Sequence, residues 1–141
     1  MKRYFMIREV VCPHIYRKMW VKAWVYVDPR LQAVMVWLRE SLARTIYVNR
    51  LTQGLTQRGV RCNLCSLVRF KTMVGECYLS PHIFGAACDF DVKGMTAEQV
   101  RLWIVEHEDE VPYPVRLEKD VTWVHLDVLN NTDKKVVMFQ S

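Results

Sequence analysis

The chain has 141 residues, of which 51% are hydrophobic and 25% are charged, close to an ordinary globular composition. Five Trp, six Tyr and five Phe provide ample apolar surface to bury, which excludes a mainly disordered chain. Proline and aromatic residues interrupt any heptad pattern and so exclude a coiled coil. Length and composition predict one domain that covers residues 1–141.

The net charge of +5 comes mainly from basic residues in the first half of the chain. Such an asymmetry favours a polyanionic partner, and nucleic acid and the bacterial cell wall both fit it. No apolar run approaches the roughly 20 residues that span a bilayer, so membrane insertion is not expected. Arg8 and Glu9 interrupt the apolar start too early for a secretory signal, which predicts a protein made in the cytoplasm.

The clearest predicted helix covers residues 28–43. Asp28 can cap it, and Pro29 suits its first position. Apolar residues recur along it at helical spacing, at Leu31, Val34, Met35, Leu38 and Leu42. A short strand over 45–48 follows, and residues 52–59 are typical of a loop.

A second helix is predicted from Thr96, where Thr96 and Gln99 form a capping box. His107 lies on its apolar face, and we expect it to be half-buried at the edge of the core. Pro112 and Pro114 end the helix and predict an extended passage.

Two strands are predicted near the end of the chain, over 121–129 and 135–139, with Asn130-Asn131 as the turn of a hairpin between them. Helices interspersed with hairpin strands predict an α+β fold. We expect a small antiparallel sheet with two or three helices packed on one face.

Five cysteines form an odd set, which favours reduced thiols: Cys12, Cys62, Cys65, Cys77 and Cys88. Cys62 and Cys65 form a C-x-x-C pair, which is also typical of a redox site or half of a zinc site. A redox pair should lie between a strand and a helix in a βαβ unit, whereas this pair follows a loop. A structural zinc would need Cys12 with His14, or Cys77, to complete it.

The most informative stretch is Ser80–Asp91, SPHIFGAACDFD, in which His82 and Asp89 are separated by small residues. Further along, Trp123, His125 and Asp127 should share one face of a strand, because alternate residues point the same way. The pattern predicts three candidate metal ligands, namely His82, Asp89 and His125. The alternative is that the two histidines are unrelated and Asp89 caps a turn.

Two histidines and one carboxylate leave an open position on a tetrahedral zinc, which is typical of a catalytic site. At such a site the metal lowers the pKa of a bound water and polarises a substrate carbonyl.

SPHIFGAACDFD resembles the S-x-H-x-x-G-x-A-x-D pattern of the D-Ala-D-Ala carboxypeptidase family of zinc metallopeptidases, which includes phage L-alanyl-D-glutamate endolysins. WVHLDV is similar to the closing strand of the family's small single-domain branch. Weaker agreement extends to Phe5–Glu9 and to TIYVNR. The resemblance implies a hedgehog/DD-peptidase-like fold with the zinc site at the sheet.

Carried over by position, the resemblance assigns His82, Asp89 and His125 as zinc ligands. It assigns Arg50 to the substrate carboxylate, a role suited to a bidentate guanidinium. The family's usual S-G-Y-R motif is absent. Three other arginines are alternatives for binding the substrate carboxylate: Arg58, Arg61 and Arg69.

The chain departs from the family at Thr122, where several members have an acidic general base. The nearby carboxylates are Asp120 and Asp127. Asp120 is favoured as the catalytic base, because a side chain at the strand mouth could reach the metal-bound water. Asp127 is the alternative base, or else it orients His125.

These features predict a zinc-dependent peptidase, of carboxypeptidase or endopeptidase type, that cleaves peptidoglycan stem peptides by attack of metal-bound water. It would be a phage- or prophage-derived cell-wall hydrolase that acts on the wall when released. One alternative is a catalytically impaired metal-binding module that binds cell-wall peptide or a protein partner. Another is a small basic nucleic-acid binder, which gives no account of His82, Asp89 and His125.

Overall fold

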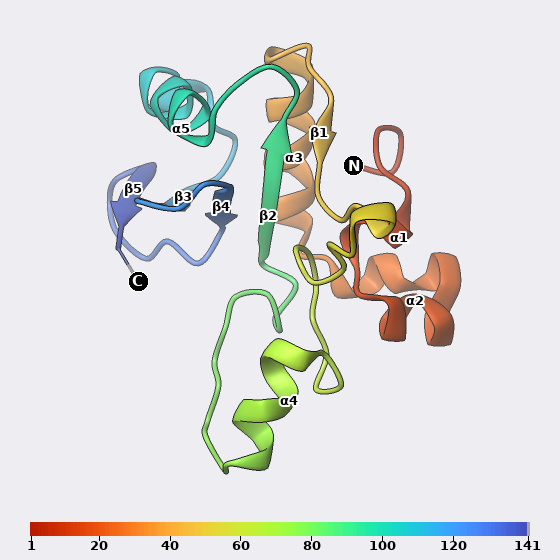
Figure 1. Cartoon of the computed structure of the whole chain (residues 1–141). Helices are drawn as coiled ribbons and strands as arrows, with labels where there is room; N and C mark the ends of the chain where they lie inside the picture. Colours follow the sequence, from red (N-terminus) through yellow and green to blue (C-terminus); the bar gives the residue numbers. More distant parts are fainter. Residues whose placement is uncertain (141) are drawn as a thin grey trace.

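The computed structural model describes residues 1–140 and has a five-stranded sheet at its centre (Figure 1). The strand order is β1-β2-β4-β3-β5. Neighbouring strands are antiparallel, except that β3 and β5 are parallel. The bounds are β1 Ile46–Tyr47, β2 Ala87–Val92, β3 Val115–Glu118, β4 Val124–Asp127 and β5 Val136–Phe139. The fold is α+β, as predicted.

Helices precede, interrupt and flank the sheet. The α-helices are α1 Ile7–Val10, α2 Pro13–Met19, α3 Pro29–Ser41, α4 Ser66–Met73 and α5 Ala97–Glu106. Three 3₁₀ helices complete the described part of the chain: η1 Trp20–Tyr26, η2 Leu51–Gln53 and η3 Glu108–Glu110. Within residues 1–140, no helix is both long and apolar enough to cross a membrane.

The two predicted helices form with the predicted caps. The Asp28 carboxylate accepts a hydrogen bond from the backbone N–H of Arg30 at 2.8 Å, at the start of α3. At the start of α5, the Thr96 hydroxyl accepts from the Gln99 N–H at 3.2 Å, and the Gln99 side chain accepts from the Thr96 N–H at 2.8 Å. The local signals in the sequence therefore determine where both helices begin.

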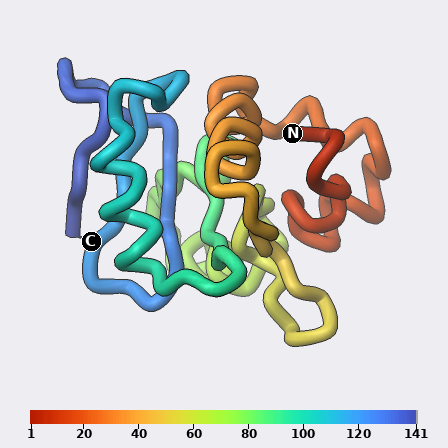
Figure 2. The backbone as a smooth tube through the Cα atoms, turned by 90° about the horizontal axis from the view of Figure 1, so that it is seen from above, coloured from red at the N-terminus to blue at the C-terminus, as the bar shows by residue number. Residues whose placement is uncertain are grey.

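Helices α3 and α5 cover one face of the sheet and lie side by side in Figure 2, with Trp37 and Trp103 in contact at 5.5 Å between ring centroids. Their buried residues share one core with alternate residues of the strands: Leu31, Val34, Met35, Leu38, Val100 and Ile104 with Cys88, Phe90, Val124 and Leu126. Cys88 thus faces away from Asp89, as predicted. Residues in between, including Asp89 and His125, face the opposite side of the sheet.

The hairpin prediction for the last two strands is wrong, because β5 pairs with β3 in parallel and not with β4. Both edges of β4 are already occupied, by β2 on one side and β3 on the other. The chain after β4 must therefore cross the end of β3. The Asn130 amide supports this crossing by donating to the carbonyls of Val115 and Lys134 at 3.1 and 2.8 Å.

Candidate metal centre

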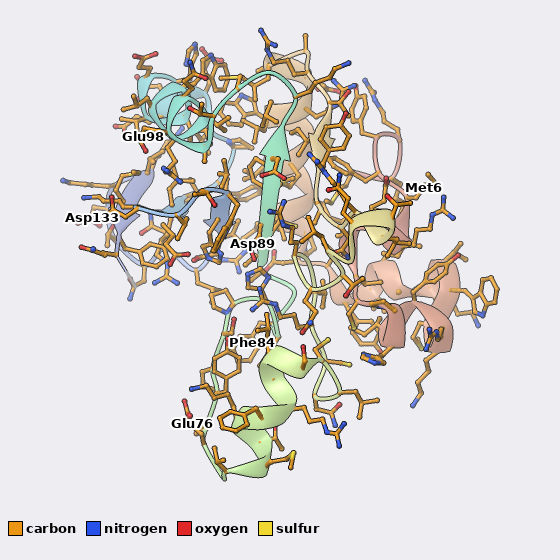
Figure 3. All side chains as sticks on the ribbon, viewed as in Figure 1. Met6, Glu76, Phe84, Asp89, Glu98 and Asp133 are labelled. Carbon is orange, nitrogen blue, oxygen red and sulfur yellow. The ribbon has the colours of Figure 1, made fainter. Side chains whose placement is uncertain are left out.

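The structure brings the three predicted ligands together on the sheet face opposite α3 and α5. His82 lies in the turn before β2, Asp89 on β2 and His125 on β4. Their ligand atoms all lie within 4.8 Å of one another, and all three residues are buried. Figure 3 labels Asp89 on β2, facing the segment that carries α4.

The three side chains converge on one point. His125 Nδ1 lies 2.7 Å from Asp89 Oδ1, and His82 Nε2 lies 3.3 Å from the same oxygen. The two ring nitrogens are themselves 3.3 Å apart. Two imidazole nitrogens and a carboxylate oxygen aimed at one another are the donor set of an open zinc site.

The opposite nitrogen of each imidazole also has a partner. His82 Nδ1 lies 2.9 Å from the carbonyl oxygen of Gly59, so Nδ1–H donates and leaves Nε2 for the centre. His125 Nε2 lies 3.4 Å from Asp127 Oδ2. Carbonyl and carboxylate partners of this kind fix the orientation of metal-binding histidines, so the observed residues fit a metal ion.

Charge within the centre is balanced by ion pairs. Burial raises the pKa of Asp89, but hydrogen bonds from His125 and His82 outweigh it and hold the pKa well below its usual range. Burial lowers the pKa of His125, yet hydrogen bonds to Asp127 and Asp89 outweigh it and raise the pKa to about 9. A cation that binds here would compete with protons for the histidine nitrogens, because a histidine ligand must be neutral.

Asp127 is fully buried and committed to other groups. Arg116 donates two hydrogen bonds to its carboxylate, at 2.9 and 3.0 Å, and the Leu129 N–H donates a third at 2.9 Å. Burial raises its pKa, but hydrogen bonds from His125 and Arg116 outweigh this and lower it. Asp127 thus holds the ring of His125, which is the positioning role predicted for it as an alternative to the catalytic one.

A cavity of about 570 Å³ opens beside the three candidate ligands. Its wall includes three cations, Arg61, Lys71 and Arg116, and three aromatic residues, Tyr78, Trp123 and Phe139. The wall also carries three acidic residues, Asp89, Glu118 and Asp127, so the cavity offers groups of both charges beside its aromatic side chains.

Arg50 does not line this cavity. Its guanidinium lies 3.5 Å from the Asp91 carboxylate and 4.2 Å from the centre of the Tyr47 ring. Arg61, which competed with Arg50 in the sequence, does line the cavity and donates to Asp89 Oδ2 at 3.0 Å. Lys71 and Arg116 were not identified from the sequence.

Asp120 does not line the cavity either. It is exposed, with a φ of 60° in the turn between β3 and β4. Glu118, two residues earlier, lines the cavity together with Asp89 and Asp127. Alternation along β3 could have identified it, because Val115 and Leu117 are buried in the core while Arg116 and Glu118 face the other side.

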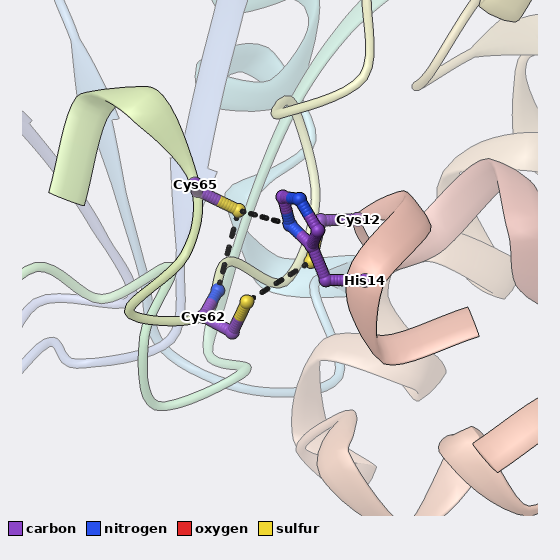
Figure 4. Close-up of side chains that lie close together, drawn as sticks. All are labelled: Cys12, His14, Cys62 and Cys65. Carbon is purple, nitrogen blue, oxygen red and sulfur yellow. Dashed lines mark hydrogen bonds between the residues drawn. The ribbon is translucent and has the colours of Figure 1, made fainter. Parts of the chain in front are cut away.

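A second group of candidate ligands lies beside α2 and α4. Cys12, His14, Cys62 and Cys65 have ligand atoms within 4.8 Å of one another and could hold a metal ion (Figure 4). All five cysteines are free, and Cys77 is exposed and outside this group.

His107 belongs to neither group: it is half-buried, stacks on Trp103 at 4.0 Å, and its Nδ1 lies 2.8 Å from the Trp103 carbonyl oxygen. Its predicted position at the edge of the core is confirmed.

Comparisons of the chain with models of known families, with curated proteins and with solved structures found no match. The function is therefore inferred from the site and the sequence motifs alone.

Proposed function

We propose that this chain is a zinc-dependent peptidase that cleaves peptidoglycan stem peptides. The observation that carries the proposal is the convergence of His82, Asp89 and His125 at one cavity, with a partner on the far nitrogen of each ring. A bound zinc would polarise the scissile carbonyl and lower the pKa of a water molecule. The S-x-H-x-x-G-x-A-x-D motif supports a cell-wall substrate over other peptides.

Three residues would keep the ligands in place. The Gly59 carbonyl holds His82 through Nδ1, and Asp127 holds His125 through Nε2. Arg116 in turn holds both carboxylate oxygens of Asp127. Ligands fixed in this way lose little entropy when the metal binds, because their rings are already oriented.

Glu118 would serve as the proton acceptor in place of Asp120. It lines the cavity beside the candidate ligands, on the side of β3 that faces away from the core. Its carboxylate would take a proton from the attacking water and deliver it to the leaving amine nitrogen.

Arg61 and Lys71 would bind the carboxylate of the stem peptide. Lys71 pairs with Glu76 at 2.9 Å at the cavity edge, and both side chains are partly exposed, so an incoming carboxylate can compete for the ammonium. Arg61 also neutralises Asp89, which limits its freedom to turn toward substrate. Tyr78 and Trp123 would contact the apolar parts of the peptide.

The test is hydrolysis of a synthetic stem pentapeptide by the zinc-loaded chain, with products identified by mass spectrometry. Cleavage next to a D-residue that stops with a chelator and returns with zinc is the expected result. Glu118→Gln should lose turnover, whereas Glu110→Gln, an exposed glutamate in η3, is the matched control. Zinc-loaded protein that leaves the peptide intact would refute the proposal.

A non-catalytic metal-binding module is the second candidate, and one observation favours it. Thr122 stands where several family members have the acidic base, and it lines a different cavity, beside the start of α5. Binding of the pentapeptide to the zinc-loaded chain in calorimetry, with no hydrolysis, would identify this function.

A further inference from the structure

We propose that Cys12, His14, Cys62 and Cys65 bind a second zinc ion, which stabilises the fold and takes no part in catalysis. Cys12 Sγ and Cys62 Sγ are 3.7 Å apart, and Cys65 Sγ lies 3.9 Å from His14 Nδ1 (Figure 4). Three sulfurs and one imidazole nitrogen form the closed four-ligand set of a structural zinc site. The group at His82 differs, because it leaves a coordination position open.

The backbone brings these residues together by a short parallel pairing. Val11 and Val60 form a parallel bridge, in which Val60 donates to the Val10 carbonyl at 2.8 Å and Cys12 donates to the Val60 carbonyl at 2.9 Å. Cys12 and Cys62, fifty positions apart, therefore meet at the end of this pairing. Gly59 permits the approach, because a Cβ there would overlap the Val10 carbonyl.

The turn between Cys62 and Cys65 directs both sulfurs to one side. The Cys65 N–H donates to the Cys62 carbonyl at 3.0 Å, and the Cys62 N–H donates to Cys65 Sγ at 3.4 Å. An N–H that donates to sulfur stabilises negative charge on it, as a metal-bound thiolate requires.

Soft ligands and geometry favour zinc over other occupants. Three cysteine sulfurs select a thiophilic ion, and hard cations such as Mg²⁺ and Ca²⁺ require oxygen ligands that this group lacks. A disulfide between Cys12 and Cys62 is the main chemical alternative. It would leave Cys65 and His14 without a shared partner, and Cys12 and Cys65 are both buried.

The site would stabilise a segment that packs weakly. Helix α4 has eight residues, of which Val68 alone is buried. Leu67, Phe70 and Met73 are exposed. So short a helix is not stable in water without tertiary contacts. Zinc would fix Cys65, at the start of α4, to Cys12 and His14, at the start of α2.

This segment also forms one wall of the cavity at the first centre. Lys71 on α4, and Tyr78 and Ser80 beyond it, line that cavity. The second zinc therefore supports the shape of the cavity without contacting it.

Metal analysis of the full chain by plasma mass spectrometry tests the proposal. We expect about two zinc ions per chain in the wild type and about one in Cys12→Ser, Cys65→Ser and His125→Ala. Cys77→Ser is the matched control and should keep both. With Co²⁺ in place of zinc, the thiolate-to-metal charge-transfer absorption should persist in His125→Ala and disappear in Cys65→Ser.

Trypsin supplies a readout of stability that is independent of catalysis. Arg69 and Lys71 on α4 should be cleaved faster in Cys65→Ser than in Cys77→Ser. If a cysteine variant fails to fold, the wild-type protein alone still tests whether a second zinc is bound. A mercurial reagent that displaces zinc from thiolates should release about one zinc per chain.

Release of no zinc by the mercurial, full metal content in Cys12→Ser, or a Cys12–Cys62 disulfide in the native protein would each overturn the proposal. None of these results depends on hydrolysis. The failure of this proposal and the failure of the peptidase proposal are therefore distinguishable.

Discussion

Asp89 on β2 lies directly opposite His125 on β4, and their side chains meet at 2.7 Å. This register places one candidate ligand on each of two antiparallel strands at the same height of the sheet. A shift of either strand by one residue would turn its ligand into the core, because side chains alternate between the two faces. The strand pairing that builds the core therefore also builds the metal centre.

Removal of a ligand should abolish tight zinc binding at the first centre. Loss of a residue that only orients a ligand lowers zinc affinity by about 10–100-fold. His125→Ala removes a ligand itself and should lower the affinity by more than this. Equilibrium dialysis followed by metal analysis measures this loss. His107→Ala is the control, since His107 lies outside both groups of ligands. If His125→Ala keeps the same zinc content as His107→Ala, the centre is not a metal site.

Asp127→Asn should lower zinc affinity about 10–100-fold without removing a ligand, because the carboxylate that orients His125 is lost. A competition titration with a chromophoric chelator measures the change. Asp133→Asn, in the loop between β4 and β5, is an exposed control. Unchanged affinity in Asp127→Asn with a large loss of turnover would instead make Asp127 a catalytic group.

Glu118 and Asp120 can be separated by rate and metal content measured together. Glu118→Gln should lower the turnover of stem peptide by about 10²–10⁴-fold while zinc stays bound, as expected when a proton acceptor is removed. Asp120→Ala should remain active, because Asp120 lies outside the lining of the cavity. The reverse pattern would restore Asp120 as the base.

The cap of α3 should contribute a pH-dependent part of the stability. A hydrogen bond from Arg30 is the largest cause that lowers the pKa of Asp28 below its unfolded value of 3.8. The contribution is therefore present above about pH 4 and is lost as the pH falls through the folded pKa. Asp28→Ala should cost about 1 kcal/mol near pH 6.

Urea unfolding at pH 6 and pH 3 checks this prediction, with Asp133→Ala as the exposed control. The difference in the free energy of unfolding between the wild type and Asp28→Ala should be smaller at pH 3 than at pH 6. A difference of the same size at both pH values would mean that the charge of Asp28 does not contribute to stability.

Local signals in the sequence sufficed for part of the structure. Caps and helical spacing predicted α3 and α5, and the alternation of residues 123–128 predicted which side of β4 carries His125. Spacing and motif together predicted the set of His82, Asp89 and His125. Each of these features depends on residues close together in the chain, or on a motif whose residues are known to share one site.

Features that depend on distant pairing were not predictable in the same way. The hairpin at Asn130 was wrong because the neighbours of β4 come from elsewhere in the chain. Helix α4 was not predicted, and Val68 is its one buried residue, because Leu67, Phe70 and Met73 recur at helical spacing but remain exposed. For Cys62 and Cys65 the sequence offered two sets of partners, Cys12 with His14 or else Cys77. The bridge between Val11 and Val60, which brings Cys12 to Cys62, selects the first.

Residues 59–62 contribute to both candidate metal centres. The Gly59 carbonyl meets His82, Arg61 meets Asp89, and Cys62 meets Cys12. In the course of divergence, an inserted or deleted residue here would move the partners of two sites at once. Natural relatives should therefore vary in length elsewhere, for example at residues 74–79, and keep a constant spacing from Gly59 to Cys62.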